Sequence, residues 1–245
     1  MFKEINLILL ILLITTNIFG VNDKIFSKGS LSPETLAQFL SSGNSDLSDE
    51  LAKEFATIYI EESEDEGINW DVAFVQMCLE TGFLNYGGLV DSSQNNFCGL
   101  GSFGDNKGAI FPTIREGVRA HIQHLKAYSS TEDLKKELLD PRFHYVQRGS
   151  APHATDLAGR WAEDPHYGTK IVSLLKKINT IEDNLFVQNE KVMDDSMMGS
   201  DFVKKSVELV VSEESSDTTI KSLEETHKDE VLLDDLLLEE SGWLR

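Results

Sequence analysis

Between Asn69 and Gly82 lies a stretch that is apolar at almost every position. Asn69 is a good N-cap, and the spacing predicts a helix from Trp70 to about Thr81. A helix with apolar side chains on all its faces has to be covered on all of them by other elements. The sequence therefore predicts a helical domain that is built around this one central helix.

Five further segments have helix starts or apolar residues at helical spacing: 32–41, 48–66, 113–128, 131–139 and 165–179. Residues 82–108 differ, because seven of the chain's 17 glycines fall there. Such a density favours loops or a small hairpin over a helix. The predicted fold class is mainly α, with the helices interrupted once by a small glycine-rich lobe.

Residues 1–20 have the pattern of a secretory signal peptide, with Lys3, an apolar run from Leu7 to Ile14, and Gly20. The alternative is an uncleaved anchor. As a helix, residues 5–20 would reach only roughly 24 Å, which is short of a bilayer core of about 30 Å. We therefore expect cleavage near Gly20, no stable membrane span afterwards, and export to the periplasm or cell envelope. We predict a short linker at residues 21–31.

The chain has a formal net charge of -20, and its last segment is strongly acidic. Residues 181–245 hold 18 acidic against 6 basic side chains and few aromatic ones, so we predict an acidic, largely disordered tail. This leaves residues 32–180 as the functional domain. An acidic surface repels phosphate backbones, so no binding to nucleic acid is expected.

Two cysteines and two histidines are candidates for a disulfide or a metal site. Cys78 and Cys98 either form a disulfide or are two buried thiols, and we favour the thiols because disulfide frames normally use more pairs. Their spacing fits no zinc motif. His121 and His124 lie three apart without a third ligand at a suitable spacing, so we expect them to pack and hydrogen-bond in the core. We predict no metal and no cofactor.

Glu80 is an unusual carboxylate because it ends the apolar helix. Burial among Met77, Leu79 and Phe83 would raise its pKa, and so would the negative end of the helix dipole. A carboxyl group that stays protonated near neutral pH is what glycosidic cleavage needs to protonate the leaving oxygen. The alternative, that Glu80 only reaches solvent at a frayed helix end, fits the local residues equally well.

Two further segments carry side chains that suit a sugar site. Residues 94–101 combine amides with an aromatic ring, and residues 161–168 place Tyr167 beside a glycine at a predicted helix start. Taken alone, the first segment is better explained as a turn and the second as a helix start with a packed aromatic ring.

Together, these segments resemble the bacterial glucosaminidase family, glycoside hydrolase family 73, over about residues 32–179. Residues 76–83 (QMCLETGF) look like the family's helix that ends in Glu-Ser/Thr-Gly, and residues 95–100 (NNFCGL) look like its Asn-Asn-x-x-Gly segment. Residues 117–121 and 164–171 follow in the family's order. The resemblance implies a lysozyme-like helical fold with a cleft between two lobes. It also implies cleavage of the β-1,4 bond after N-acetylglucosamine in peptidoglycan glycan strands.

By position, the resemblance assigns Glu80 as the general acid and Tyr167 as a cleft tyrosine that the family needs for activity. It also assigns a segment that lines the cleft and binds substrate: Asn95, Asn96, Phe97 and Gly99.

The second carboxylate is open. Many family members carry it on a hairpin of the middle lobe. In this chain the only acidic residues between Gly82 and Glu116 are Asp91 and Asp105. Asp105 is the candidate base for a water molecule, and the alternative is attack by the substrate's own N-acetyl oxygen, which needs no protein base. Two other function classes are a non-catalytic glycan-binding protein on the same fold and a protein that binds partners through its acidic tail. We expect a monomer.

Overall fold

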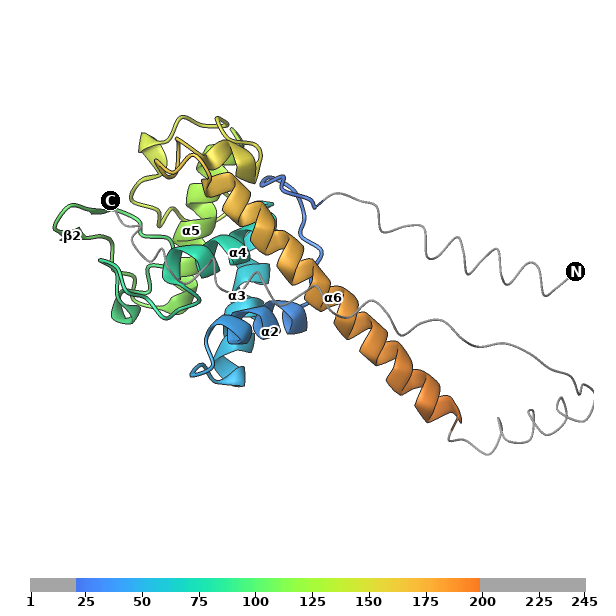
Figure 1. Cartoon of the computed structure of the whole chain (residues 1–245). Coiled ribbons are helices and arrows are strands. Elements are labelled where there is room, and N and C mark those ends of the chain that lie inside the picture. Colours follow the sequence, from blue (N-terminus) through green and yellow to red (C-terminus); the bar gives the residue numbers. More distant parts are fainter. Residues whose placement is uncertain (1–20, 199–245) are drawn as a thin grey trace, which may run out of the picture.

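The computed structural model describes the backbone of residues 21–198 and the side chains of residues 21–188. The helices of this part are α2 (Pro33–Gly43), α3 (Asp49–Glu66), α4 (Trp70–Thr81), α5 (Ile114–Ser129) and α6 (Tyr167–Met198). Three short 3-10 helices, η1 (Ser92–Gln94), η2 (Phe143–Tyr145) and η3 (Ala154–Leu157), accompany one antiparallel hairpin, β1 (Ser102–Phe103) with β2 (Asn106–Lys107) (Figure 1). The mainly α fold class is confirmed. The predicted signal peptide, 1–20, and residues 199–245 of the predicted tail lie outside the described residues.

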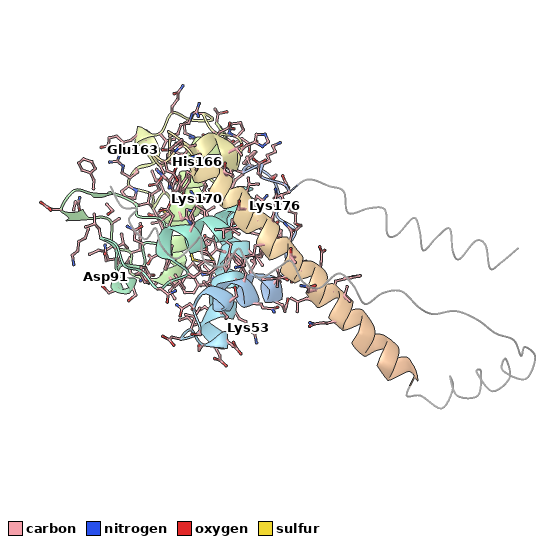
Figure 2. The ribbon with its side chains drawn as sticks, viewed as in Figure 1. Lys53, Asp91, Glu163, His166, Lys170 and Lys176 are labelled. Atoms are coloured by element: carbon pink, nitrogen blue, oxygen red, sulfur yellow. The ribbon has the colours of Figure 1, made fainter. Side chains whose placement is uncertain are left out.

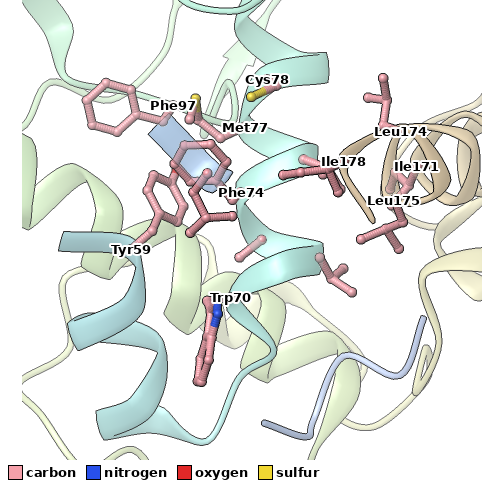
Figure 3. Close-up of a cluster of buried hydrophobic side chains, with 14 of the residues drawn as sticks. Tyr59, Trp70, Phe74, Met77, Cys78, Phe97, Ile171, Leu174, Leu175 and Ile178 are labelled. Carbon is pink, nitrogen blue, oxygen red and sulfur yellow. The ribbon is translucent and has the colours of Figure 1, made fainter. Parts of the chain in front are cut away.

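Helix α4 is the central helix that the sequence predicts. The Asn69 side chain accepts a hydrogen bond from the backbone N–H of Asp71 at the helix start, and Gly82 ends the helix in the left-handed conformation with φ of 57°. Helices α2, α3, α5 and α6 all contact α4. Phe74 and Met77 are fully buried between them (Figure 3). Since each large apolar side chain contributes roughly 1.5–3 kcal/mol when buried, α4 holds the four surrounding helices together.

The first half of α6 packs along α4. Four buried apolar residues of α6 belong to the same core cluster as the α4 side chains and are labelled in Figure 3: Ile171, Leu174, Leu175 and Ile178. The first turn of α6 also lies close to η3, because a Cβ at Gly168 would be only 2.5 Å from the Cα of Thr155. Glycine at this position therefore allows the approach that places Tyr167, the first residue of α6, against the core.

Helices α3 and α5 are joined by two buried carboxylates of α3. Glu66 accepts a hydrogen bond from Lys126 at 2.8 Å, and both side chains are fully buried. Glu62 accepts hydrogen bonds at 2.8–3.2 Å from three cations: Arg115, Arg119 and Lys136. Burial alone would raise the pKa of Glu62, but the hydrogen bonds from these cations outweigh it and lower the pKa below its usual value.

The predicted helix at residues 131–139 is wrong, because this segment is irregular. The backbone N–H groups of Lys135 and Lys136 donate to the Glu66 carboxylate at 3.0–3.1 Å. The N–H of Leu139 donates to the side-chain oxygen of Gln123 at 2.7 Å. Since buried side chains of α3 and α5 take these donors, they are not free for a helical ladder. Helical spacing is a local signal and does not reveal such distant acceptors.

Residues 21–31 differ from the short linker that the sequence predicts, because they pack as part of the domain. Ile25 is fully buried; its N–H donates to the carbonyl of Pro152 at 2.9 Å, and its carbonyl accepts from the N–H of Asn69 at 2.8 Å. The N–H of Leu31 donates to the Asp71 carboxylate at 3.1 Å. These contacts join residues far apart in sequence, so the composition of the segment gives no sign of them.

Helix α6 crosses the predicted domain boundary at Thr180. Ile181 packs against the core, and the Glu182 carboxylate accepts hydrogen bonds from Ser32, at 3.0 Å, and from Thr35. Ser32 caps α2, so Glu182 lies at the positive end of that helix dipole. Figure 1 shows α6 extending past α2 and away from the other described elements. None of the described helices, α6 included, is long and apolar enough to cross a membrane.

Residues 82–108 form loops, the short 3-10 helix η1 and one small hairpin, which agrees with the loops or hairpin that the glycine content predicts. In the hairpin Ser102 pairs with Lys107 and Phe103 with Asn106, which leaves Gly104 and Asp105 in the turn. The implied cleft between this lobe and the helices stays a prediction.

Candidate active site

Glu80, in the last turn of α4, receives two hydrogen bonds on one carboxylate oxygen. The indole N–H of Trp161 donates to Oε1 at 2.9 Å, and the hydroxyl of Tyr167 donates to the same atom. The other oxygen, Oε2, accepts no hydrogen bond from the described residues, and Glu80 as a residue is partly exposed. The carboxylate therefore has one oxygen held by two donors and one oxygen that accepts no hydrogen bond from the described residues.

The pKa of Glu80 is raised above its usual value. Burial raises it, and the hydrogen bonds from Tyr167 and Trp161 lower it by a smaller amount. Desolvation dominates because the carboxylate ends an apolar helix and no cation contacts it among the described residues. The structure thus agrees with the direction that the sequence predicts and places the group inside a polar cluster rather than at a frayed end.

Tyr167 stays a hydroxyl donor in this cluster. Burial raises its pKa well above the usual value, and the nearby charge of Glu80 raises it further. Its oxygen accepts a hydrogen bond from the side-chain amide of Gln76 at 2.8 Å. Gln76 lies on α4 one turn before Glu80 and is fully buried. Sequence reasoning assigned no role to Gln76.

Trp161 lies in the loop that leads into α6, a loop marked in Figure 2 by the labels of Glu163 and His166. Its ring packs against three aromatic groups of α5, with centroid distances of 4.9 Å to His124, 5.6 Å to Tyr128 and 5.8 Å to His121. Its backbone N–H donates to the carbonyl of Leu157 at 2.8 Å. The sequence singled out the segment 161–168 but not the indole, because only the fold shows which side chain meets Glu80.

The side chains of the predicted substrate-binding segment make hydrogen bonds and packing contacts within the glycine-rich lobe and its flanking residues. The Asn96 side chain is buried, accepts from the N–H of Leu100 at 2.9 Å and donates to carbonyls of the lobe. Asn95, with φ of 49°, donates to the carbonyl of Phe111 at 2.9 Å. Phe97 is buried and Gly99 has φ of 66°. These residues hold the loop in shape, and their contact with substrate stays a prediction.

Asp105 is exposed in the turn between β1 and β2. No hydrogen bond or ion pair joins it to Glu80 or to any other described residue. Its position on a hairpin of the middle lobe matches the place where the family resemblance puts a second acid. Its role as a base stays a prediction.

The two histidines and two cysteines take up structural positions. His121 contacts Tyr59 and Gln76, and the Nδ1 atom of His124 lies 2.8 Å from the Asp140 carboxylate. Among the described residues no group of three or more His, Cys, Asp or Glu side chains is arranged to hold a metal ion. The sequence's two candidate cysteines, Cys78 and Cys98, are both free and buried, as expected.

The part of the chain that holds this site is similar to known proteins. Residues 56–180 match the family model Glucosaminidase, described as mannosyl-glycoprotein endo-beta-N-acetylglucosaminidase. The chain is also 42% identical over 155 residues to a protein of Borreliella burgdorferi that is described as uncharacterized. That match covers 63% of this chain and 76% of the relative. The family match includes Glu80, Trp161 and Tyr167.

Proposed function

Because the chain belongs to the glucosaminidase family, we propose that it is an exported peptidoglycan hydrolase that cleaves the β-1,4 bond after N-acetylglucosamine. Glu80 is the general acid in this proposal. The substrate of the enzyme is the glycan strand of the cell wall. The protein acts in the periplasm or cell envelope, as a monomer. The family supports a glycosidase of peptidoglycan in general, and the bond and the acid are the proposed parts.

The observation that carries the proposal is the unequal environment of the two Glu80 oxygens. Two donors on Oε1 disfavour a proton on that atom, so the proton of the neutral acid resides on Oε2, which accepts no hydrogen bond from the described residues. Burial keeps the pKa raised, so the acid form persists to higher pH than for an exposed glutamate. A protonated oxygen that no described residue engages is suited to donate to the leaving glycosidic oxygen.

The nucleophile that attacks the anomeric carbon can be a water molecule or the substrate's N-acetyl oxygen, and the two routes differ in stereochemistry. If Asp105 is the base for a water, the first product has inverted configuration, whereas attack by the substrate's N-acetyl oxygen retains it. NMR of the first-formed anomer separates the routes. Asp105→Asn provides the second check, because only the base route predicts a large loss of turnover.

The test of Glu80 uses Glu80→Gln on purified peptidoglycan. Glutamine keeps the shape and the Oε1 acceptor but has no transferable acid proton, so turnover falls about 10²–10⁴-fold. Glu54→Gln, an exposed glutamate of α3, is the matched control and keeps wild-type turnover. Mass spectrometry of the products names the new reducing end, which has to be N-acetylglucosamine. Near-full turnover in Glu80→Gln, or another reducing end, contradicts the proposal.

A further inference from the structure

We propose that Gln76 and His121 are positioning residues: with Tyr59 and Tyr167 they form a one-way chain of hydrogen-bond donors that ends on Glu80 Oε1. The proposal deepens the function given above and rests on Glu80 being the acid. Neither Gln76 nor His121 contacts the substrate or the reacting atoms in this account, and both act through the Tyr167 hydroxyl.

The chain crosses the core from α3 to α6. The Tyr59 hydroxyl lies 3.0 Å from His121 Nδ1, and His121 Nε2 lies 3.1 Å from Gln76 Oε1. Gln76 Nε2 lies 2.8 Å from the Tyr167 oxygen, and the Tyr167 hydroxyl contacts Glu80. Tyr59, Gln76 and His121 are fully buried, so bulk water does not replace a missing link.

Each link fixes the direction of the next. Tyr167 has one proton, and when Glu80 is ionised that proton goes to the carboxylate, so the Tyr167 oxygen accepts from the Gln76 NH₂ group. The Gln76 carbonyl then faces His121 and needs an N–H there, on Nε2. A neutral ring with its proton on Nε2 has a lone pair on Nδ1, which accepts from the Tyr59 hydroxyl.

The charge states of the chain agree with this direction. Burial lowers the pKa of His121 to about 3, with a smaller contribution from His124, so the imidazole is neutral over the working range. Burial also raises the pKa of Tyr59, which therefore keeps its proton and donates it. In the reverse direction, Gln76 would present its carbonyl to Tyr167, and the tyrosine proton would turn away from Glu80. The observed direction keeps that proton on Oε1 and thus leaves Oε2 as the oxygen that carries the acid proton.

A double-mutant cycle distinguishes this role from mere packing of buried polar groups. Tyr167→Phe lowers kcat about 5- to 150-fold, the loss expected for one aligned hydrogen bond. Gln76→Met has a similar volume and removes both links, and it lowers kcat by no more than Tyr167→Phe does. Because Gln76 acts through Tyr167, adding Gln76→Met to Tyr167→Phe changes kcat by less than about twofold.

Gln123→Met is the matched control. Gln123 is a buried glutamine of α5 that binds the backbone of residues 137–140 and takes no part in the chain. Its substitution lowers Tm but leaves kcat per folded molecule unchanged. If Gln76→Met behaves in the same way, or if its effect multiplies with that of Tyr167→Phe, Gln76 is structural only and the proposal is overturned.

A second measurement uses the wild-type protein and needs neither hydrolysis nor a stable variant. Nitrogen-15 NMR of the His121 ring is expected to show a neutral imidazole protonated on Nε2 from pH 7 to pH 5. A proton on Nδ1 overturns the direction of the chain.

If Glu80→Gln retains full turnover while the NMR result holds, the proposed function fails and the chain stands as a structural fact. If Glu80→Gln is inactive but the effects of Gln76→Met and Tyr167→Phe on kcat multiply, only the positioning role fails.

Discussion

The carboxylate of Glu80 is held in a place where burial opposes its charge. Two neutral donors, the Trp161 indole and the Tyr167 hydroxyl, compensate for part of the lost water, and no cation among the described residues does so. The raised pKa therefore has a consequence for folding as well as for catalysis. Above the usual pKa of a glutamate the unfolded chain releases the Glu80 proton more readily than the folded protein does.

We predict that Glu80→Gln is more stable than the wild type at pH 7. For an acid with a raised folded pKa, the stability contribution is present at low pH, below the unfolded value near 4.5, and is lost as pH rises through the folded pKa. Glutamine avoids this loss, so the Tm difference is positive at pH 7 and closes below about pH 4.5. Differential scanning calorimetry at pH 7 and pH 4 checks this. An equal Tm at pH 7 would mean that Glu80 is well solvated.

Trp161→Phe tests the other donor to Oε1. The phenyl ring still packs near His124 and Tyr128, but the N–H is lost. Losing a donor to the charged form raises the pKa of Glu80 further, so the high-pH limb of the kcat profile moves to higher pH. Turnover at the optimum falls by about 5- to 150-fold if that hydrogen bond strengthens in the transition state. A profile that keeps its wild-type limb contradicts the role given to the indole.

The sequence predicts part of this site and not the rest for a physical reason. Glu80 and Tyr167 belong to short segments whose residue types indicate their chemistry. Trp161, Gln76 and His121 make their contacts across 45 to 91 positions of sequence. A buried glutamine or histidine in an apolar stretch has the same local appearance whether it supports a catalytic group or only satisfies its neighbours.

At the scale of elements, the helices that carry their own start signals are those that the sequence places well. Helix α4 begins at its Asn69 cap and ends at Thr81 as predicted, and α2 and α3 begin after their serine caps. The helix predicted at residues 131–139 does not form, because backbone N–H groups of this segment donate to the side chains of Glu66 and Gln123. The end of α6 is missed because acidic composition predicts disorder there, whereas Glu182 is stabilised by the start of α2.

A pair of truncations tests the extension of α6. The composition of residues 181–245 predicts that removing them leaves Tm unchanged. The structure predicts instead that truncation after Thr180 lowers Tm, because it removes Ile181 from the core and Glu182 from Ser32 and Thr35. A charge at a helix N-terminus alone contributes about 0.3–1 kcal/mol. Truncation after Gln188 is the control and keeps these contacts. Equal melting of both proteins would show that the contacts of residues 181 and 182 contribute nothing to stability.

For the molecule as a whole, the joint between α3 and α5 combines hydrophobic packing with buried charge. Glu66 and Lys126 are fully buried as a pair, while Lys28 and Glu64 form an exposed one. A buried ion whose partner is removed is far more costly than an exposed one, because water cannot replace the partner. The stability of the domain is therefore sensitive to this pair.

Lys126→Met is predicted to destabilise the domain by about 3–5 kcal/mol, since it leaves the Glu66 carboxylate buried without its cation. Lys28→Met, at the exposed pair, is predicted to cost about 0–1 kcal/mol. Urea unfolding of both variants and of the wild type gives the two values. Similar costs for the two substitutions would mean that Glu66 is compensated by its backbone donors alone.

The Glu66 carboxylate also sets the order in which the chain can become structured. It receives the N–H groups of Lys135 and Lys136, which lie 69 and 70 positions later in the sequence. These amides have no local partner that could hold them early, because contacts of such separation form only after the intervening chain has closed. Residues 131–139 are thus expected to be ordered late in folding. In the native protein, however, these amides are expected to exchange their hydrogens slowly although they belong to no helix or strand, so their protection would report the docking of this loop on α3.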